Sequence, residues 1–171
     1  MNTLEAFRYV LFMQVLATAE KTCTFEYEKR APIPTERQMS AGLKAAWECS
    51  KQSNCLKKKC GAALVHDGNV IAVGFGGREG EACTVCARDN GEVFYSDGCY
   101  SVHAEMRAVM QAVHTIVMPD TQGFFSQCTM YTTHGPCDAC MKLMDYVGIR
   151  HVVYDVEYKT DYSHYPRIRV E

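Results

Sequence analysis

The chain has 171 residues, a formal net charge of −2 and 47% hydrophobic residues. This length fits one domain with its own core, and the charge argues against a surface that grips nucleic acid, because such domains are usually strongly basic. The count of ten cysteines is high. However, no secretory signal pattern opens the chain and no apolar run could span a bilayer. We therefore expect a cytoplasmic protein without membrane or nucleic-acid partners, in which paired cysteines hold metal more often than they form disulfides.

The first predicted element is a helix over residues 4–19, where apolar residues recur at three- or four-residue spacing. A proline-containing connector follows. Thr35 and Gln38 then have the spacing of a capping box, which predicts a second helix that runs to about Ser53. We assign residues 1–35 to an N-terminal helix and connector, and residues 36–171 to the main domain.

A hairpin is predicted next, because two β-rich stretches, residues 61–66 and 69–75, are joined through Asp67 and Gly68. Residues 76–101 are rich in Gly, Asp and Cys and are too long for an ordinary connection. The remaining elements alternate helix, strand, helix, strand over residues 102–113, 129–133, 137–146 and 149–154. This order predicts an α/β sheet with helices layered against it.

Two short motifs open the last two predicted helices. His103 and Glu105 flank one alanine, and Cys137 and Cys140 lie three residues apart, so that both cysteines point the same way from a helix. One imidazole and two thiolates make three protein ligands and leave a fourth position for water, as a catalytic zinc site requires. A helix N-terminus also stabilises thiolates, because its free N–H groups carry partial positive charge.

Glu105 has the position of a proton shuttle between a zinc-activated water and a leaving amine. The combination of H-x-E with P-C-x-x-C is the signature of zinc deaminases. We therefore predict a zinc-dependent hydrolytic deaminase in which His103, Cys137 and Cys140 hold the metal and Glu105 is the catalytic acid and base. The alternative is a non-catalytic structural zinc protein, in which two C-x-x-C pairs hold one ion.

Four segments resemble deoxycytidylate (dCMP) deaminases of the zinc-dependent cytidine/deoxycytidylate deaminase superfamily. They are residues 53–62 (SNCLKKKCGA), 74–77 (GFGG), 103–109 (HAEMRAV) and 131–143 (YTTHGPCDACMKL). The resemblance implies a three-layer α/β/α fold with a mixed sheet of about five strands, and conversion of dCMP to dUMP and ammonia. It also implies a homo-oligomer, with a hexamer favoured, and allosteric binding of dCTP or dTTP together with Mg²⁺.

Two positions depart from the family's pattern. Gly76 and Arg107 stand where the family has asparagines. Gly76 has no side chain to hold a sugar or base, whereas the forked cation of Arg107 could meet a phosphate. The substrate could therefore be another cytosine nucleotide or nucleoside, or a polynucleotide. The predicted substrate contacts are Phe75, Ala104, Arg107, His134, Lys57, Lys58, Lys59 and Tyr154.

A second metal site is implied by the same resemblance, because some dCMP deaminases carry an additional structural zinc held by the long loop. The expected ligands are Cys55, Cys83, Cys86 and Cys99. Four cysteines would make a closed tetrahedral site and would hold a long irregular stretch that has no core of its own. The alternative is that Cys55 is simply buried and that the loop carries a C-x-x-C redox pair.

Overall fold

A computed structural model describes residues 36–80, 82, 84–86, 99–116, 120–158 and 160–171 of the chain. The helix predicted at residues 4–19, the cap predicted at Thr35 and the proposed ligand Cys83 lie outside the described residues. The boundary between residues 35 and 36 stays a prediction. Within the described part, no helix combines the length and the apolar character needed to cross a bilayer.

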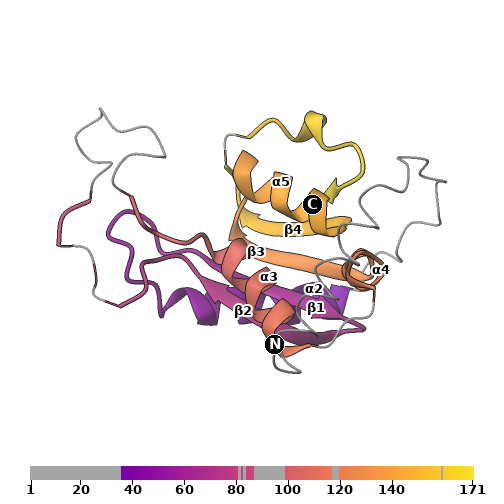
Figure 1. Cartoon of the computed structure of the whole chain (residues 1–171), viewed down its shortest axis with the longest axis horizontal. Helices are drawn as coiled ribbons and strands as arrows, with labels where there is room; N and C mark the ends of the chain where they lie inside the picture. The colour runs from indigo at the N-terminus through magenta and orange to yellow at the C-terminus, as the bar shows by residue number, and fades with distance from the viewer. Residues whose placement is uncertain (1–35, 81, 83, 87–98, 117–119, 159) are drawn as a thin grey trace, which may run out of the picture.

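The centre of the fold is a five-stranded mixed sheet in the order β2-β1-β3-β4-β5 (Figure 1). The strands are β1 (Gly61–His66), β2 (Asn69–Phe75), β3 (Cys128–His134), β4 (His151–Val156) and β5 (Arg169–Val170). Strand β1 is antiparallel to β2 and to β3, whereas β4 is parallel to β3 and to β5. The predicted mixed sheet of about five strands is therefore confirmed.

Helices cover both faces of this sheet. They are α2 (Glu36–Ser50), α3 (Ala104–Thr115), α4 (Thr121–Ser126) and α5 (Asp138–Val147), with a short 3₁₀ helix, η1, at Tyr162–His164. One core cluster joins the sheet to α3, α4 and α5, and a second joins it to α2. Successive strand residues alternate between the clusters, because side chains along a strand point to opposite faces. Thus Met130 packs under α3 and α5, and Tyr131 packs under α2.

The two strands of the hairpin have the predicted bounds. Asp67 and Gly68, which join them, both have positive φ (47° and 75°), as a two-residue type I′ turn requires. The structure adds three short elements that the sequence pattern does not predict, α4, η1 and β5. Helix α4 has six residues and begins where the side chain of Asp120 accepts a hydrogen bond from the Gly123 amide. Elements this short cannot display a hydrophobic period.

Candidate metal and catalytic site

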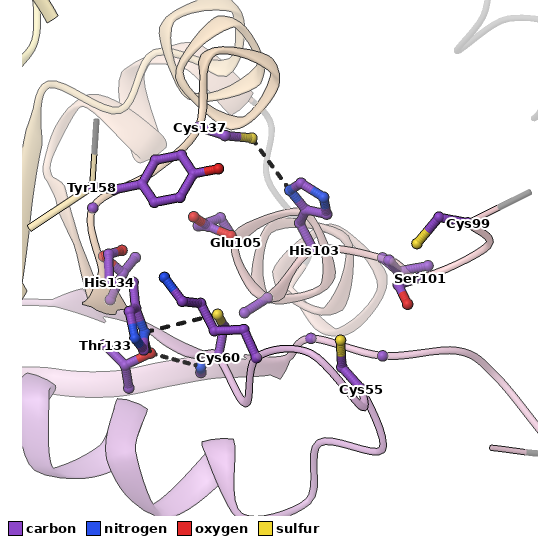
Figure 2. Close-up of a pocket in the computed structure, with 18 residues that line it drawn as sticks. Cys55, Cys60, Cys99, Ser101, His103, Glu105, Thr133, His134, Cys137 and Tyr158 are labelled. Atoms are coloured by element: carbon purple, nitrogen blue, oxygen red, sulfur yellow. Dashed lines mark hydrogen bonds between the residues drawn. The ribbon is translucent and has the colours of Figure 1, made fainter. Parts of the chain in front are cut away.

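The two motifs meet at the starts of α3 and α5. His103 is the N-cap of α3 and Cys137 is the N-cap of α5, so both residues leave their helices in an extended conformation. Nδ1 of His103 lies 3.3 Å from Sγ of Cys137 and 3.3 Å from Sγ of Cys140. The three possible ligand atoms lie within 4.8 Å of one another, and Figure 2 shows His103 and Cys137 side by side.

The electrostatics of this group favour a thiolate. A hydrogen bond from Cys140, together with one from His103, lowers the pKa of Cys137 to about 4. Cys140 is fully buried. One imidazole nitrogen and two sulfurs at this separation are a donor set that suits zinc. Within the described residues this is the one group of three His, Cys, Asp or Glu side chains close enough to hold a metal ion.

Glu105 lies two residues after His103, in the first turn of α3. It is almost completely buried, with 7% of its surface exposed. Burial raises the pKa of its carboxyl above the ordinary value, because the charged form loses its hydration. A carboxyl with a raised pKa exchanges protons more readily near neutral pH than an exposed one does, as general acid–base chemistry requires. The arrangement can therefore bind a divalent metal and move a proton beside it.

The ligand group and Glu105 open into one pocket, which encloses about 780 Å³ including the open solvent at its mouth. The predicted residues that line it are His103, Ala104, Glu105, Cys137, Lys58, His134, Cys55 and Cys99. Fully buried Cys140 sits behind this lining. The predicted contacts Lys57, Lys59, Phe75, Arg107 and Tyr154 are not among the lining residues.

Arg107 does not line the pocket, and its guanidinium binds neighbouring backbone and acidic groups. Its Nε donates to the carbonyl oxygen of Phe75 at 3.0 Å, and a terminal nitrogen donates to that of Gly77 at 3.2 Å. The guanidinium also forms an ion pair with Glu79 and stacks over the ring of Phe75, 4.4 Å from its centroid. The cation that we expected to meet a phosphate thus ties α3 to the end of β2. Lys59 is engaged too, because its Nζ donates to the carbonyl oxygen of Ser53 at 3.0 Å.

Ten further residues line the pocket without having been predicted as contacts, among them Cys60, Thr133 and Tyr158. Oγ1 of Thr133 accepts from the Gly61 amide at 3.1 Å and lies 3.0 Å from Nδ1 of His134. Lys58 lies over the ring of Tyr158, with Nζ 5.1 Å from its centroid. Thr133 could have been predicted as a pocket residue from its position just before the P-C-x-x-C motif. Nothing in the sequence indicates that Tyr158 and Lys58 lie close together.

His134 faces this group of residues from the end of β3 (Figure 2). Burial, together with the nearby charge of Lys58, lowers the pKa of its imidazole below the ordinary value. The ring is therefore neutral at pH 7. Its Nδ1 also lies 3.8 Å from Sγ of Cys60. We expected His134 near the metal, and it lines the pocket together with the ligand group.

The layered sheet and the His-Cys-Cys group define a zinc-binding deaminase domain. The sequence model for the cytidine and deoxycytidylate deaminase zinc-binding region matches residues 34–156. The chain belongs to this family.

Three relatives illustrate the similarity. The chain is 33% identical over 125 residues to a deoxycytidylate deaminase of Mycobacterium phage D29, covering 67% of this chain and 91% of the relative. It is 34% identical over 110 residues to ComE operon protein 2 of Bacillus subtilis, covering 64% of this chain and about half (54%) of that protein. The crystal structure of dCMP deaminase from cyanophage S-TIM5 with dCMP and dUMP aligns with a TM-score of 0.64 at 25% identity, covering 81% of this chain and 98% of that one.

Proposed function

We propose that the protein is a zinc-dependent hydrolytic deaminase that converts dCMP and water to dUMP and ammonia. The observation that carries the proposal is the convergence of His103, Cys137 and Cys140 beside the buried carboxyl of Glu105, in one open pocket. The names of the phage relatives support the choice of dCMP, since one is a deoxycytidylate deaminase and another is a dCMP deaminase solved with dCMP and dUMP.

His103, Cys137 and Cys140 would hold the zinc ion and leave its open side toward the pocket. When bound, zinc supplies a water activated as a nucleophile at neutral pH. Glu105 would accept one proton of that water and donate it to the ring nitrogen of the base. It would then take the second proton, from the hydroxyl added to the ring carbon, and deliver it to the departing amine, which leaves as ammonia while the carbonyl forms. Its burial serves this role, because a raised pKa lets the carboxyl hold each proton between accepting it and donating it.

Lys58 is the residue that we propose for the phosphate of the substrate. It lines the pocket and carries a positive charge beside Tyr158, so it can offer a charge-assisted hydrogen bond to a phosphate oxygen. Thr133 and His134 provide polar groups on the same wall. A polynucleotide substrate is less well supported, because the chain has a net charge of −2 and offers little general attraction for phosphates.

The second zinc site is also a proposal. Cys55 and Cys99 both line the pocket, and Figure 2 shows their sulfur atoms on the same side of it. Cys86 is half-buried, and the fourth expected ligand is Cys83. The described residues do not bring Cys55, Cys86 and Cys99 into a compact ligand group. Metal content of the wild type and of Cys86→Ser would test this site, since loss of one ligand should lower the zinc stoichiometry.

The remaining expectations from the family are proposals of the same kind. They are a homo-oligomer, with a hexamer favoured, allosteric binding of dCTP or dTTP with Mg²⁺, and a cytoplasmic location. Light scattering with and without each nucleotide would test the first two together. A single species at the monomer mass under all conditions would contradict the hexamer.

The function itself is tested by ammonia release from the zinc-loaded protein. The panel is cytidine, deoxycytidine, CMP, dCMP, dCTP and a short single-stranded oligonucleotide. Selective turnover of dCMP is the expected result. Turnover of another compound alone would support the deamination chemistry but assign a different substrate. Absence of ammonia release from every compound would favour the structural zinc protein.

A further inference from the structure

The segment that follows β4 is built into the core, although its sequence predicts no element. Residues 161–171 form η1 and β5 and run alongside α5 (Figure 1). Tyr165 and Ile168 are each 7% exposed and belong to the core cluster beneath α3 and α5. The Glu171 amide donates to the carbonyl oxygen of Val152 at 2.9 Å. This segment, which we call the C-terminal clasp, is therefore fixed at both its middle and its end.

The clasp contacts the turn that carries the first cysteine ligand. We call residues 135–138 the ligand turn. The hydroxyl of Tyr162 donates to the carbonyl oxygen of Pro136 at 3.1 Å, and the hydroxyl of Tyr165 donates to that of Asp138 at 3.2 Å. The single proton of Tyr165 is shared between that carbonyl oxygen and the side-chain carboxylate of Asp138. The two phenols thus bind the residues immediately before and after Cys137.

The ligand turn needs this support because Cys137 is the N-cap of α5. The side chain of Cys137 makes no capping hydrogen bond. Its carbonyl oxygen accepts a hydrogen bond from the Met141 amide at 2.9 Å, the first one within the helix. Cys140, in contrast, lies inside α5 and is fully buried. The helix itself determines the position of Cys140, whereas the position of Cys137 depends on what holds the turn.

The fit between clasp and turn is close. A Cβ atom added at Gly135 would lie 2.5 Å from the hydroxyl of Tyr162 and 3.1 Å from Cβ of Tyr158. Burial is the main reason that the pKa of Tyr162 and that of Tyr165 are both raised to about 12. Both phenols therefore keep their protons at neutral pH and remain donors. Because glycine has no Cβ atom, position 135 leaves room for the side chain of Tyr162.

We infer that Tyr162 and Tyr165 are positioning residues for the zinc ligand Cys137, because their hydroxyls fix the backbone on both sides of it. The inference rests on the proposed zinc site. Groups that orient a metal ligand from behind typically change metal affinity by about 10- to 100-fold when they are removed. The clasp would thus set how tightly the metal is held, without touching either the metal or the substrate.

The test compares Tyr162→Phe and Tyr165→Phe with Tyr146→Phe, whose side chain lies on α5 and is 77% exposed. Zinc affinity is measured by chelator competition, and ligand geometry by the visible absorption spectrum of the Co²⁺-loaded protein. We expect each clasp variant to bind zinc about tenfold more weakly and to show altered thiolate-to-cobalt bands. The control should match the wild type.

A role in stability alone would give a different result. The two clasp variants would then unfold at lower temperature, while their folded molecules kept wild-type zinc affinity and the wild-type Co²⁺ spectrum, and this outcome would overturn the inference. Gly135→Ala provides a second route, because its added Cβ would displace the hydroxyl of Tyr162 from the ligand turn while both tyrosines are retained. It should weaken zinc binding in the same direction, and unchanged binding would count against the inference.

Cys137→Ser separates this inference from the proposed function. If that variant keeps the zinc stoichiometry and affinity of the wild type, Cys137 is not a ligand, and both the proposed zinc site and the role of the clasp fail. If Cys137→Ser loses zinc binding but the tyrosine variants bind as the wild type does, the proposed function stands and the inference about the clasp fails.

Discussion

The two sides of the pocket are built in different ways. The metal side, formed by His103, Glu105, Cys137 and Cys140, comes from the first turns of two helices, and Glu105 and Cys140 are buried. The far wall, which we define as Lys58, His134 and Tyr158, comes from three separate places: the turn before β1, the end of β3 and the chain after β4. Under the proposed function, the reaction would therefore depend on a buried, locally fixed unit, whereas substrate selection would depend on residues from separate parts of the chain.

Glu105→Gln should have the largest effect, because it removes the proposed proton carrier from the metal side and keeps the shape of the side chain. We expect ammonia release from dCMP to fall by about 10²- to 10⁴-fold, the usual contribution of a general acid–base group. Zinc content, measured by atomic absorption, should stay at the wild-type level. Retained turnover would remove Glu105 from the mechanism, and lost zinc would make it a ligand.

Lys58→Ala should change binding on the far wall and leave the metal side intact. A hydrogen bond to a charged group contributes about 1.5–3 kcal/mol, so KM for dCMP should rise by about tenfold or more. Turnover of deoxycytidine, which has no phosphate, should not change. Lys51→Ala is the matched control, since Lys51 is exposed and pairs with Glu48 on α2. An equal change for both substrates would exclude a phosphate contact.

His151, which begins β4, should make stability depend on pH. Burial lowers the pKa of its imidazole from 6.5, although Glu171 partly opposes the shift. The unfolded chain therefore binds a proton more readily than the folded one, so the unfolding free energy should fall as pH drops below about 6.5. Urea unfolding at pH 7.5 and pH 5.5 should show a smaller pH effect for His151→Gln. An identical effect in both proteins would contradict this assignment.

Tyr131→Phe should have the smallest effect. The hydroxyl of Tyr131 is buried and has no hydrogen-bond partner within the described part of the chain, and the side chain packs under α2, on the face opposite the pocket-forming helices. Removing an unpaired buried hydroxyl should change the unfolding free energy by at most about 1 kcal/mol, in the stabilising direction. Urea unfolding measures the change in stability, and dCMP turnover tests whether the pocket on the opposite face is unaffected. A large loss of stability would reveal a missing partner.

The metal side could be predicted because its residues lie in two short motifs, each at a helix start whose local geometry follows from spacing. The hairpin could be predicted from Asp67 and Gly68 for the same local reason. The far wall could not be assembled in this way, because Lys58 and Tyr158 meet only after the sheet has formed. Arg107 shows the limit most clearly. Its position beside the catalytic motif indicated a substrate contact, yet its guanidinium faces backbone carbonyls and Glu79.

Gly76 lines the pocket at a position that can accept a side chain. A Cβ atom added there would meet Cβ of Cys60 at 3.5 Å, which is ordinary van der Waals contact, and the position does not require the left-handed backbone that Gly77 adopts nearby, with a φ of 155°. A Cβ atom can therefore be added at this point of the pocket lining without straining the backbone. A change in this one codon would therefore alter the lining of the pocket while the buried group of His103, Glu105, Cys137 and Cys140 stayed the same.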